Sequence, residues 1–433
     1  MIRRSPAGPS SPRAAASPTG VGAGAVLVAV LALSACSAFS TNARLAQTEA
    51  SGDGVLRIGM LLDNTGASAF LNEAQQAAVE LAIQQANAAG GHKGRPIEFL
   101  QPSVTSDTGA AARQLVAAKA DVVIGPTDSS RAPAAIDVLD KAKTVLISPA
   151  NLDPALSGYR SDGYYFRTAP SETAEGAALV NVAKSKDATS VAVLRQKGTY
   201  GQDLGDAVAT AAKAAGLAEK GSGEFTGHDA RAAAAAAQAA GAGAVVVVAR
   251  DDAQAVLAQV HDASVPGSKI LLADAAVAQY GTGLAGGALD GASGLVPGLF
   301  PSAAFETEIL RQSPGLKDMT FAAEAYDAAA LAILAAGEAQ DDAGTSIASH
   351  LIGVSGGTAS GAATLKGSGP RTKCTALADC LGLESKGKPI DYDGQSGPIA
   401  FDANGDITTA NFTVMSYGAD NRSHQAGTQT VAR

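Results

Sequence analysis

Two short loops carry the residues whose types and spacing could hold a small ligand. Ser129 and Ser130 follow the apolar segment 121–125 and stand where a helix should begin. A second loop, 148–151, follows the next apolar segment of the chain. Hydroxyls and backbone N–H groups at a helix N-terminus stabilise a small anion. The sequence has no GxxxxGK[ST] motif, so the anion need not be a nucleotide phosphate. We expect a ligand carboxylate there, and the alternative is an ordinary capped helix.

A strand, a turn, a helix and a second strand would position both loops. The helix after Ser130 has apolar positions at Ile136 and Leu139. In a parallel sheet, ligands bind outside the carboxyl ends of the strands, and both loops stand at such ends. Strand and helix patterns alternate in the same way over 55–118 and over 163–273. The fold class that we predict is α/β, with two Rossmann-like lobes and right-handed crossovers.

The C-terminal part of the chain departs from this alternation. A strand at 291–297 and two helices after it would return the chain to the first lobe. Residues 396–401, a turn at 402–406 and residues 410–417 then predict a β-hairpin.

Composition limits the class of protein. The chain has 433 residues, which suggests two domains or one two-lobed body. It has no Trp and 4% aromatic residues, so its core must be closely packed Ala, Val, Leu and Ile. Without residues 1–35 the balance is 29 basic against 41 acidic residues. This balance argues against nucleic acid as a partner and against an electrostatic hold on anionic lipid.

The N-terminus has the order of a secretory signal. Residues 1–19 are basic and rich in Pro and Ser, and the apolar run that follows has 16 residues, fewer than the roughly 20 of a bilayer span. The run ends Leu33-Ser34-Ala35-Cys36, which resembles a bacterial lipobox. That resemblance implies that Cys36 is lipidated and becomes the first mature residue. The alternative is a signal anchor with a chance cysteine. Residues 36–54 are small and polar and predict a flexible tether.

The other two cysteines, Cys374 and Cys380, predict a disulfide, because an even pair in an exported chain usually pairs. The loop it closes is short, so its entropic contribution is modest. CxxxxxC with no nearby histidine is a poor metal signature, and we predict no metal site. The sequence also shows neither a nucleophile elbow nor an HExxH motif. We predict no catalytic residue and no cofactor, although a carboxylate pair among the 41 acidic residues stays possible.

From residue 55 to about 417 the chain resembles the type I periplasmic binding proteins. Specifically, it is similar to the branched-chain amino acid (leucine/isoleucine/valine) binding lipoproteins of ABC importers. The resemblance rests on the order and spacing of short motifs: Thr65-Gly66, Asn87-Ala88-Ala89-Gly90-Gly91, Ile124-Gly125-Pro126 with Ser129-Ser130, Ile147-Ser148-Pro149, Phe166-Arg167, Tyr200-Gly201-Gln202, Ala325-Tyr326-Asp327-Ala328 and Tyr392-Asp393-Gly394 through Gly405-Asp406. The cysteine pair ahead of Tyr392 resembles a subgroup that includes amide, urea and amino-acid binders.

The resemblance implies two lobes that close on a small ligand and then dock on a membrane permease. Crossings between the lobes are expected near 167–170, 293–297 and 396–399. The implied domains are a signal peptide at 1–35 and a tether at 36–54, followed by two lobes. The first lobe comprises 55–167 and 295–397, and the second lobe comprises 168–294 and 398–433.

The resemblance also implies ligand contacts. Ser129, with Ser130 beside it, would meet the ligand α-carboxylate, and so would the backbone N–H groups of Ala150, Asn151 and Leu152. Leu152 stands where the family has threonine, so one hydroxyl is missing, and Asn151 could replace it.

Further contacts are expected from the second lobe and from the mouth of the first loop. Tyr200 would cover a ligand ammonium by a cation–π contact, and Asp274 would pair with it. The alternatives are a helix-packing role for Tyr200 and a solvated strand end for Asp274. Phe70 is either a pocket wall or helix core. Arg250-Asp251 stands near the family's further aromatic contact, which argues against an aliphatic ligand.

These expectations define a function. The protein would be an extracytoplasmic solute-binding lipoprotein, held by its lipid alone on the outer face of the bacterial cell membrane. It would capture a small amino acid, amide or urea-like ligand and deliver it to the permease subunits of an ABC importer. The alternative is a receptor lipoprotein of the same fold that signals to a partner. An inert structural lipoprotein would not need hydroxyl-rich loops at both strand ends.

The lipobox yields a first prediction. Cys36→Ala should release the protein from membranes or leave an unprocessed precursor, because the acylated thiol is lost. Mass spectrometry of the membrane fraction measures the mature N-terminus. An unlipidated mature N-terminus at another residue would contradict the prediction.

Overall fold

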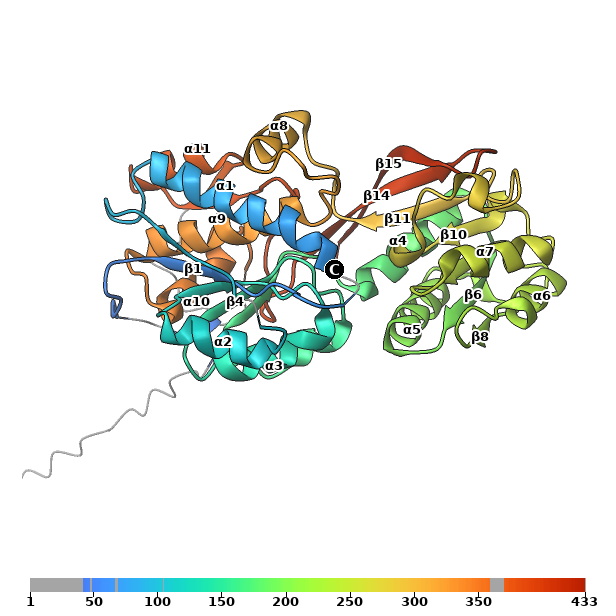
Figure 1. Ribbon diagram of the computed structural model, residues 1–433, viewed down its shortest axis with the longest axis horizontal. Helices are drawn as coiled ribbons and strands as arrows, with labels where there is room; N and C mark the ends of the chain where they lie inside the picture. The colour runs from blue at the N-terminus through green and yellow to red at the C-terminus, as the bar shows by residue number, and fades with distance from the viewer. Residues whose placement is uncertain (1–41, 47–48, 67–68, 104, 359–369, 433) are drawn as a thin grey trace, which may run out of the picture. The chain divides into compact units, whose positions relative to one another are not determined.

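The computed structural model describes residues 42–46, 49–66, 69–103, 105–358 and 370–432. The predicted signal peptide and Cys36 lie outside the described residues. Within these residues the chain forms two α/β bodies, each built on its own sheet (Figure 1). We call the body on the five-stranded sheet the first lobe and the body on the eight-stranded sheet the second lobe. Two α/β lobes were predicted, and this part of the prediction is confirmed.

The first sheet is parallel throughout and has the strand order β2-β1-β3-β4-β5. Its strands are β1 (Arg57–Met60), β2 (Glu98–Leu100), β3 (Val122–Ile124), β4 (Val145–Ser148) and β5 (Tyr165–Arg167). Successive side chains of a strand point to opposite faces. Val122 and Ile124 therefore join one core cluster while Val123 joins another. Both faces of the sheet are buried at its central strands, which explains why β3 and β4 read as largely apolar runs.

Helices cover both faces of this sheet. α1 (Asn72–Ala88), α9 (Ala322–Ala339) and α10 (Gly344–Val354) pack on one face, and α2 (Thr108–Ala117) and α3 (Ala132–Leu139) pack on the other. α8 (Ala303–Gln312) and α11 (Leu377–Glu384) lie beside α1 (Figure 1). α9 is buried from Ala322 to Ala336. Its many alanines let neighbouring helices approach closely, as the composition predicted.

The second sheet has the strand order β15-β14-β11-β10-β9-β6-β7, and β8 also pairs with β6. Its strands are β6 (Ser190–Gln196), β7 (Ala218–Glu219), β8 (Gly223–Phe225), β9 (Ala244–Val248), β10 (Ile270–Leu272), β11 (Ser293–Pro297), β14 (Thr409–Tyr417) and β15 (Ser423–Ala432). α4 (Glu172–Ser185) and α5 (Thr199–Ala214) cover one face, and α6 (Arg231–Ala239) and α7 (Ala253–Asp262) cover the other. The alanine run of α6 forms a packed helix, with Ala233, Ala234 and Ala237 buried.

The predicted C-terminal hairpin is wrong in its pairing. Residues 396–401 form no strand, and the hairpin instead joins β14 to β15. β15 lies at the edge of the sheet, and most of its side chains are exposed. A polar edge strand lacks the apolar alternation that a sequence pattern detects, so this strand was missed.

The first crossing between the lobes is tied to the third by a buried ion pair. The Arg167 Nε atom lies 2.7 Å from an Asp406 oxygen, and Arg167 is fully buried. The Arg167 backbone N–H donates to the Gly405 carbonyl, and the rings of Phe166 and Phe401 lie 5.2 Å apart. Residues up to Asp406 therefore contact the first lobe. The third crossing follows them along β14, later than the predicted 396–399.

The described part of the predicted tether lies on the first lobe. Arg44 and its neighbour Ala43 are buried, and the Arg44 guanidinium lies 4.9 Å from the centre of the Phe166 ring. Further along, the Gly52 and Gly54 N–H groups donate to the carboxylates of Asp341 and Asp342. Residues 42–46 and 49–54 are thus held by specific contacts that their small, polar composition did not reveal.

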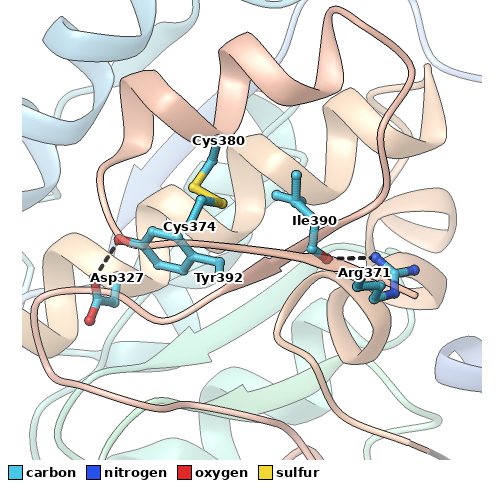
Figure 2. Close-up of a disulfide and its surroundings, with 6 residues drawn as sticks. All are labelled: Asp327, Arg371, Cys374, Cys380, Ile390 and Tyr392. Atoms are coloured by element: carbon cyan, nitrogen blue, oxygen red, sulfur yellow. Dashed lines mark hydrogen bonds between the residues drawn. A yellow bond between two sulfur atoms is a disulfide. The ribbon is translucent and has the colours of Figure 1, made fainter.

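Cys374 and Cys380 are joined by a disulfide, with their Cα atoms 5.5 Å apart (Figure 2). The bond links β12 (Thr372–Cys374) to α11, and β12 pairs with β13 (Ile390–Tyr392). At the end of β13 the Tyr392 hydroxyl donates to the buried Asp327 carboxylate at 2.6 Å. Asp327 also accepts from the Ser396 hydroxyl and backbone N–H. Its role in α9 is therefore structural.

Among the described residues, none of the helices combines the length and the hydrophobicity that a membrane span requires. The same residues hold no group of three or more His, Cys, Asp or Glu side chains that could bind a metal ion.

The cysteine pair gives a second prediction. In protein exported to an oxidising compartment, Cys374 and Cys380 should resist thiol labelling under denaturing, non-reducing conditions, because both sulfurs are bonded. Labelling should reach both after reduction, which serves as the control. Full labelling of both thiols before reduction would reject the bridge.

Candidate ligand-binding site

The first predicted loop leaves β3 through a tight turn that requires glycine. Gly125 has φ +111°, and a Cβ atom there would lie 2.3 Å from the Leu61 carbonyl oxygen. The chain then forms a 3-10 turn, Ser129–Arg131, before α3 begins at Ala132. The predicted helix start is thus a separate turn, with the Asp128 side chain as its cap.

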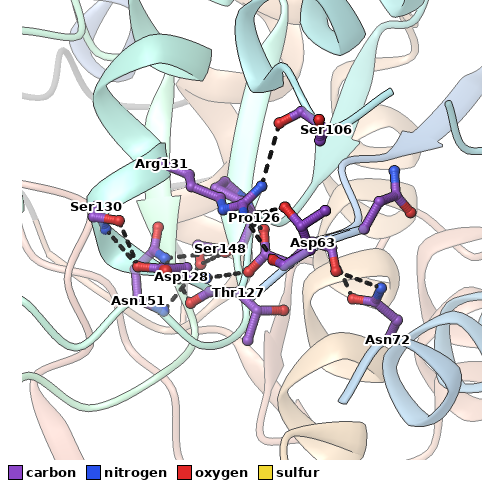
Figure 3. Close-up of polar contacts among 12 residues, drawn as sticks. Asp63, Asn72, Ser106, Pro126, Thr127, Asp128, Ser130, Arg131, Ser148 and Asn151 are labelled. Carbon is purple, nitrogen blue, oxygen red and sulfur yellow. Dashed lines mark hydrogen bonds and ion pairs between the residues drawn. The ribbon is translucent and has the colours of Figure 1, made fainter. Parts of the chain in front are cut away.

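Asp63 anchors this loop from the end of β1. It is almost fully buried, and its carboxylate accepts the Asp128 backbone N–H at 2.6 Å (Figure 3). The Arg131 guanidinium lies 3.7 Å from the other Asp63 oxygen and also donates to Thr65. Burial raises the pKa of Asp63 above its ordinary value. These contacts fix the loop that carries Ser129.

Ser129 and Ser130 differ in role. The Ser129 Oγ accepts the backbone N–H groups of Leu152 at 3.0 Å and Asp153 at 3.3 Å, so it joins the two loops. Both bonds use lone pairs of the oxygen, which leaves its proton to donate to a ligand oxygen. Ser130 is exposed, and its hydroxyl donates to Asp128 at 2.8 Å.

The second loop is held together from within. Asn151 is fully buried, and its side-chain N–H₂ group donates to the carbonyls of Pro126 at 3.0 Å and Thr127 at 3.1 Å (Figure 3). Its side-chain oxygen accepts the Tyr165 hydroxyl. The Ser148 hydroxyl accepts the N–H groups of Ala150 and Asn151.

These contacts limit the hydrogen-bond donors that the second loop can offer a ligand. The Asn151 side chain positions the two loops, so it could replace the missing threonine hydroxyl only by giving up these bonds. The N–H groups of Ala150, Asn151 and Leu152 all point to serine hydroxyls. A ligand carboxylate would therefore have to share or displace these serine contacts.

Tyr200 and Asp274, predicted from distant segments, do meet. The Tyr200 hydroxyl donates to an Asp274 carboxylate oxygen. Tyr200 lies at the start of α5 and is 8% exposed, whereas Asp274 begins a 3-10 turn after β10. Burial raises the pKa of Asp274, and burial together with the Asp274 charge raises the pKa of Tyr200. Asp274 is thus not a freely solvated strand end.

Arg250 covers one face of the Tyr200 ring, the ring that was predicted to contact a ligand ammonium. Its guanidinium carbon lies 4.2 Å from the ring centroid, a cation–π geometry. The Arg250 backbone N–H is fixed by the Gln196 side chain at 2.9 Å. The sequence placed Arg250 at the departure from the family pattern, and in the structure this residue stacks on Tyr200.

Sequence reasoning missed Glu172 and Glu175, which lie in the first turn of α4. One Glu175 oxygen accepts the Asp274 backbone N–H at 2.9 Å, and the Glu172 N–H donates to the Leu152 carbonyl at 2.9 Å. Glu172 therefore links the second lobe to the second loop. Burial, reinforced by the Asp274 charge, raises the pKa of Glu172 to about 8. Acidic residues in a first helical turn are common, so nothing in the sequence marked these two.

The remaining predicted residue, Phe70, is 65% exposed. This excludes the helix-core alternative, and the pocket-wall alternative stays a prediction. The structure thus groups Ser129 with the 150–152 loop on the first lobe and Tyr200 with Asp274 on the second. Among the hydrogen bonds of the described residues, none joins Ser129 to Tyr200 or Asp274.

The raised pKa of Glu172 gives a third prediction. Between pH 4.5 and 8 the folded state keeps a proton that the unfolded state releases, so the free energy of unfolding falls as pH rises. Glu172→Gln removes this loss and should stabilise the protein at pH 8 much more than at pH 4.5. Urea unfolding at both pH values measures the difference. Glu219→Gln, at an exposed position of β7, is the control. Equal effects at both pH values would contradict the prediction.

Comparison with known proteins agrees with this architecture. A family model described as periplasmic binding protein matches residues 55–420. The "Amino acid binding protein" of Pseudomonas aeruginosa is 33% identical over 162 residues, which cover 35% of this chain and 41% of that protein. The chain therefore matches less than half the length of that relative. A chemotactic signal transduction system substrate-binding protein of Halobacterium salinarum, BasB, is 28% identical over 83% of this chain and 85% of its own.

Among solved structures, the branched-chain amino acid transporter substrate-binding protein LivJ of Streptococcus pneumoniae, in complex with isoleucine, superposes with a TM-score of 0.59. It is 21% identical and covers 88% of this chain and 100% of its own. At this identity the likeness shows the fold. The family match over residues 55–420 goes further, because it covers most of the chain. This protein belongs to the periplasmic binding protein family, whose members bind ligands and are not enzymes.

Proposed function

We propose that this protein is an extracytoplasmic solute-binding lipoprotein that captures a small amino acid or amide-like ligand and delivers it to an ABC importer. One observation carries the proposal. The loops at the strand ends of the first sheet and the Tyr200–Asp274 pair of the second sheet are joined where the Glu172 N–H meets the Leu152 carbonyl. The Ser129 hydroxyl on one lobe and carboxylate acceptors on the other suit a ligand with a carboxyl or amide group at one end and N–H donors at the other.

The proposal includes the arrangement of the whole chain. Residues 1–35 are a signal peptide, and Cys36 carries the lipid that holds the protein on the outer face of the membrane. The first lobe comprises 55–167 and 295–397, extended to Asp406 by the Arg167–Asp406 contact. The second lobe comprises the remaining segments. Closure of the lobes on the ligand forms the surface that docks on the permease.

A second candidate function is supported by one comparison. BasB, a chemotactic signal transduction protein by name, matches this chain over 85% of its own length. The same fold could therefore present a bound ligand to a signalling partner. A deletion strain separates the two functions. Loss of ligand uptake supports the importer, whereas intact uptake with a lost response to the ligand supports the receptor.

The ligand can be found by a thermal-shift screen over amino acids, amides and urea. A ligand at ~100 times its dissociation constant adds roughly 2.7 kcal/mol to the stability of the folded state. Such a gain is large enough to detect for a weakly bound compound supplied at millimolar concentration.

Ser129 gives the fourth prediction. A hydrogen bond to a charged group contributes about 1.5–3 kcal/mol. Ser129→Ala should therefore weaken binding of the screened ligand roughly 10- to 150-fold. Calorimetry measures the dissociation constant, and a melting curve checks that the loops still fold without the bridging hydroxyl. Ser385→Ala, which removes an exposed hydroxyl at the end of α11, is the control. Wild-type affinity in a folded Ser129→Ala protein would show that Ser129 only joins the loops.

A further inference from the structure

The described residues between the predicted lipid site and β1 contact the first lobe at two places. We call residues 42–46 and 49–54 the N-terminal strap. Their small, polar composition predicts a flexible tether, but several of their contacts are made by backbone N–H groups, which a sequence pattern does not record. A docked strap shortens the free chain between an anchor and the lobe, whereas a flexible tether leaves it long.

The first contact site lies beside the first crossing. The Ala43 N–H donates to the Asp162 carbonyl at 2.8 Å. The close approach requires glycine in the neighbouring loop, because a Cβ atom at Gly163 would lie 2.2 Å from the Asn42 Oδ1 atom. The loop 159–163 is therefore shaped to receive the start of the strap.

Arg44 makes this contact site specific. Its side chain is 7% exposed, and burying a charge is costly unless other groups compensate it. The guanidinium donates to the Tyr165 carbonyl and lies 4.9 Å from the centre of the Phe166 ring. The negative charge of Asp406 also stabilises the charged form of Arg44. Three separate partners compensate one buried arginine, which indicates a built docking site.

The second contact site lies at the other end of the strap. The Ser51 and Gly52 N–H groups donate to the Asp341 carboxylate at 3.1 and 2.8 Å. The Gly54 N–H donates to the Asp342 carboxylate at 2.9 Å. Both aspartates are almost fully buried. A Cβ atom at Gly52 would lie 2.4 Å from the Asp342 Oδ1 atom, so the strap can approach this closely only with glycine.

Both contact sites adjoin α10. Asp341 and Asp342 precede this helix directly, and Asp341 also accepts the Ser346 hydroxyl at 2.6 Å. Residues 43–45 pack against the same helix. The strap therefore lies along one face of the first lobe, which consists of α10 and loop 159–163. We call this surface the α10 face.

Chain length limits the distance between the predicted lipid and the α10 face. Cys36 precedes Asn42 by six positions, and six extended residues span at most roughly 20 Å. Gly54 follows Cys36 by 18 positions, and an undocked chain of that length would span up to roughly 60 Å. Docking of the strap thus reduces the reach of the lobe about threefold.

We infer that the α10 face is the membrane-facing surface of this protein, and that its partner is the surface of the lipid bilayer in which Cys36 is anchored. This inference rests on the lipid proposed for Cys36 and adds an orientation to it. The strap contacts given above all lie on the first lobe. The first lobe is therefore held close to the bilayer, and closure on a ligand moves the second lobe relative to it.

The test compares the distances of the two lobes from the bilayer. The lipidated full chain is reconstituted in phosphatidylcholine vesicles that contain acceptor-labelled headgroups. A donor dye is attached to Arg160→Cys, at an exposed position of loop 159–163, or to Glu219→Cys, on the outermost strand of the second sheet. We expect energy transfer to be at least about twofold more efficient from position 160, because the docked strap limits its distance from the lipid.

Two variants test whether docking causes this difference. A Gly/Ser linker of about 12 residues inserted after Ser40 adds roughly 20 Å of reach and changes no described residue. It should remove most of the difference between the two dye positions. Arg44→Ala should also reduce the difference, because it removes the buried contact. Arg231→Ala, at an exposed position of α6, is the control and should leave the difference unchanged. A melting curve confirms that each variant is folded.

The outcomes separate this inference from the proposed function. Equal energy transfer from the two dye positions would overturn the inference, and so would an unchanged difference after linker insertion. Mass spectrometry of the same preparation shows whether Cys36 carries a lipid. If it does and the transfer is equal, the orientation fails while the solute-binding lipoprotein stands. If Cys36 carries no lipid, the proposed anchor and the inference fail together, and solute binding stands.

Discussion

The buried Arg167 side chain is the contact on which the candidate site most depends. Its guanidinium pairs with Asp406 at 2.7 Å and donates to the carbonyls of Asn151 at 3.1 Å and Asp153 at 2.8 Å. One residue thus holds the second loop, the end of β5 and the segment that leads to the third crossing. Removing one partner of a buried ion pair typically costs about 3–5 kcal/mol, because the other charge is left without compensation. The loops and the crossings therefore cannot vary independently of each other.

Hydrogen-bond polarity differs between the two sides of the candidate site. On the first lobe the backbone N–H groups of the second loop are already bonded to Ser129 and Ser148. On that lobe the Ser129 hydroxyl proton is left to donate to a ligand. The backbone N–H groups could contact a ligand only by sharing their bonds to the serines. On the second lobe the groups without partners are carboxylate oxygens. A small molecule with an acceptor at one end and donors at the other satisfies both sides, which is the polarity of an amino acid or an amide.

Arg44, near the start of the described chain, also contacts the first crossing. Arg44 lies over Phe166, beside Arg167, and donates to the Tyr165 carbonyl. Burial lowers the pKa of Arg44 to about 10, although the Asp406 charge opposes this effect. Arg44 is thus packed against the first crossing.

The sequence alone determined the alternation of strands and helices, the two lobes, the loops at the carboxyl ends of β3 and β4, and the cysteine pair. These features follow from local patterns, since apolar periodicity and turn residues act over a few positions. Tertiary structure decided the rest. Only packing showed that Asn151 is buried between the loops, that Arg250 stacks on Tyr200, and that Glu172 and Glu175 join Asp274. The sequence did not predict β15 either, because an edge strand forms by pairing with its neighbour and does not require an apolar face. Such contacts connect residues far apart in the chain. Burial sets the charge and the chemistry of these side chains, and no local sequence pattern records burial.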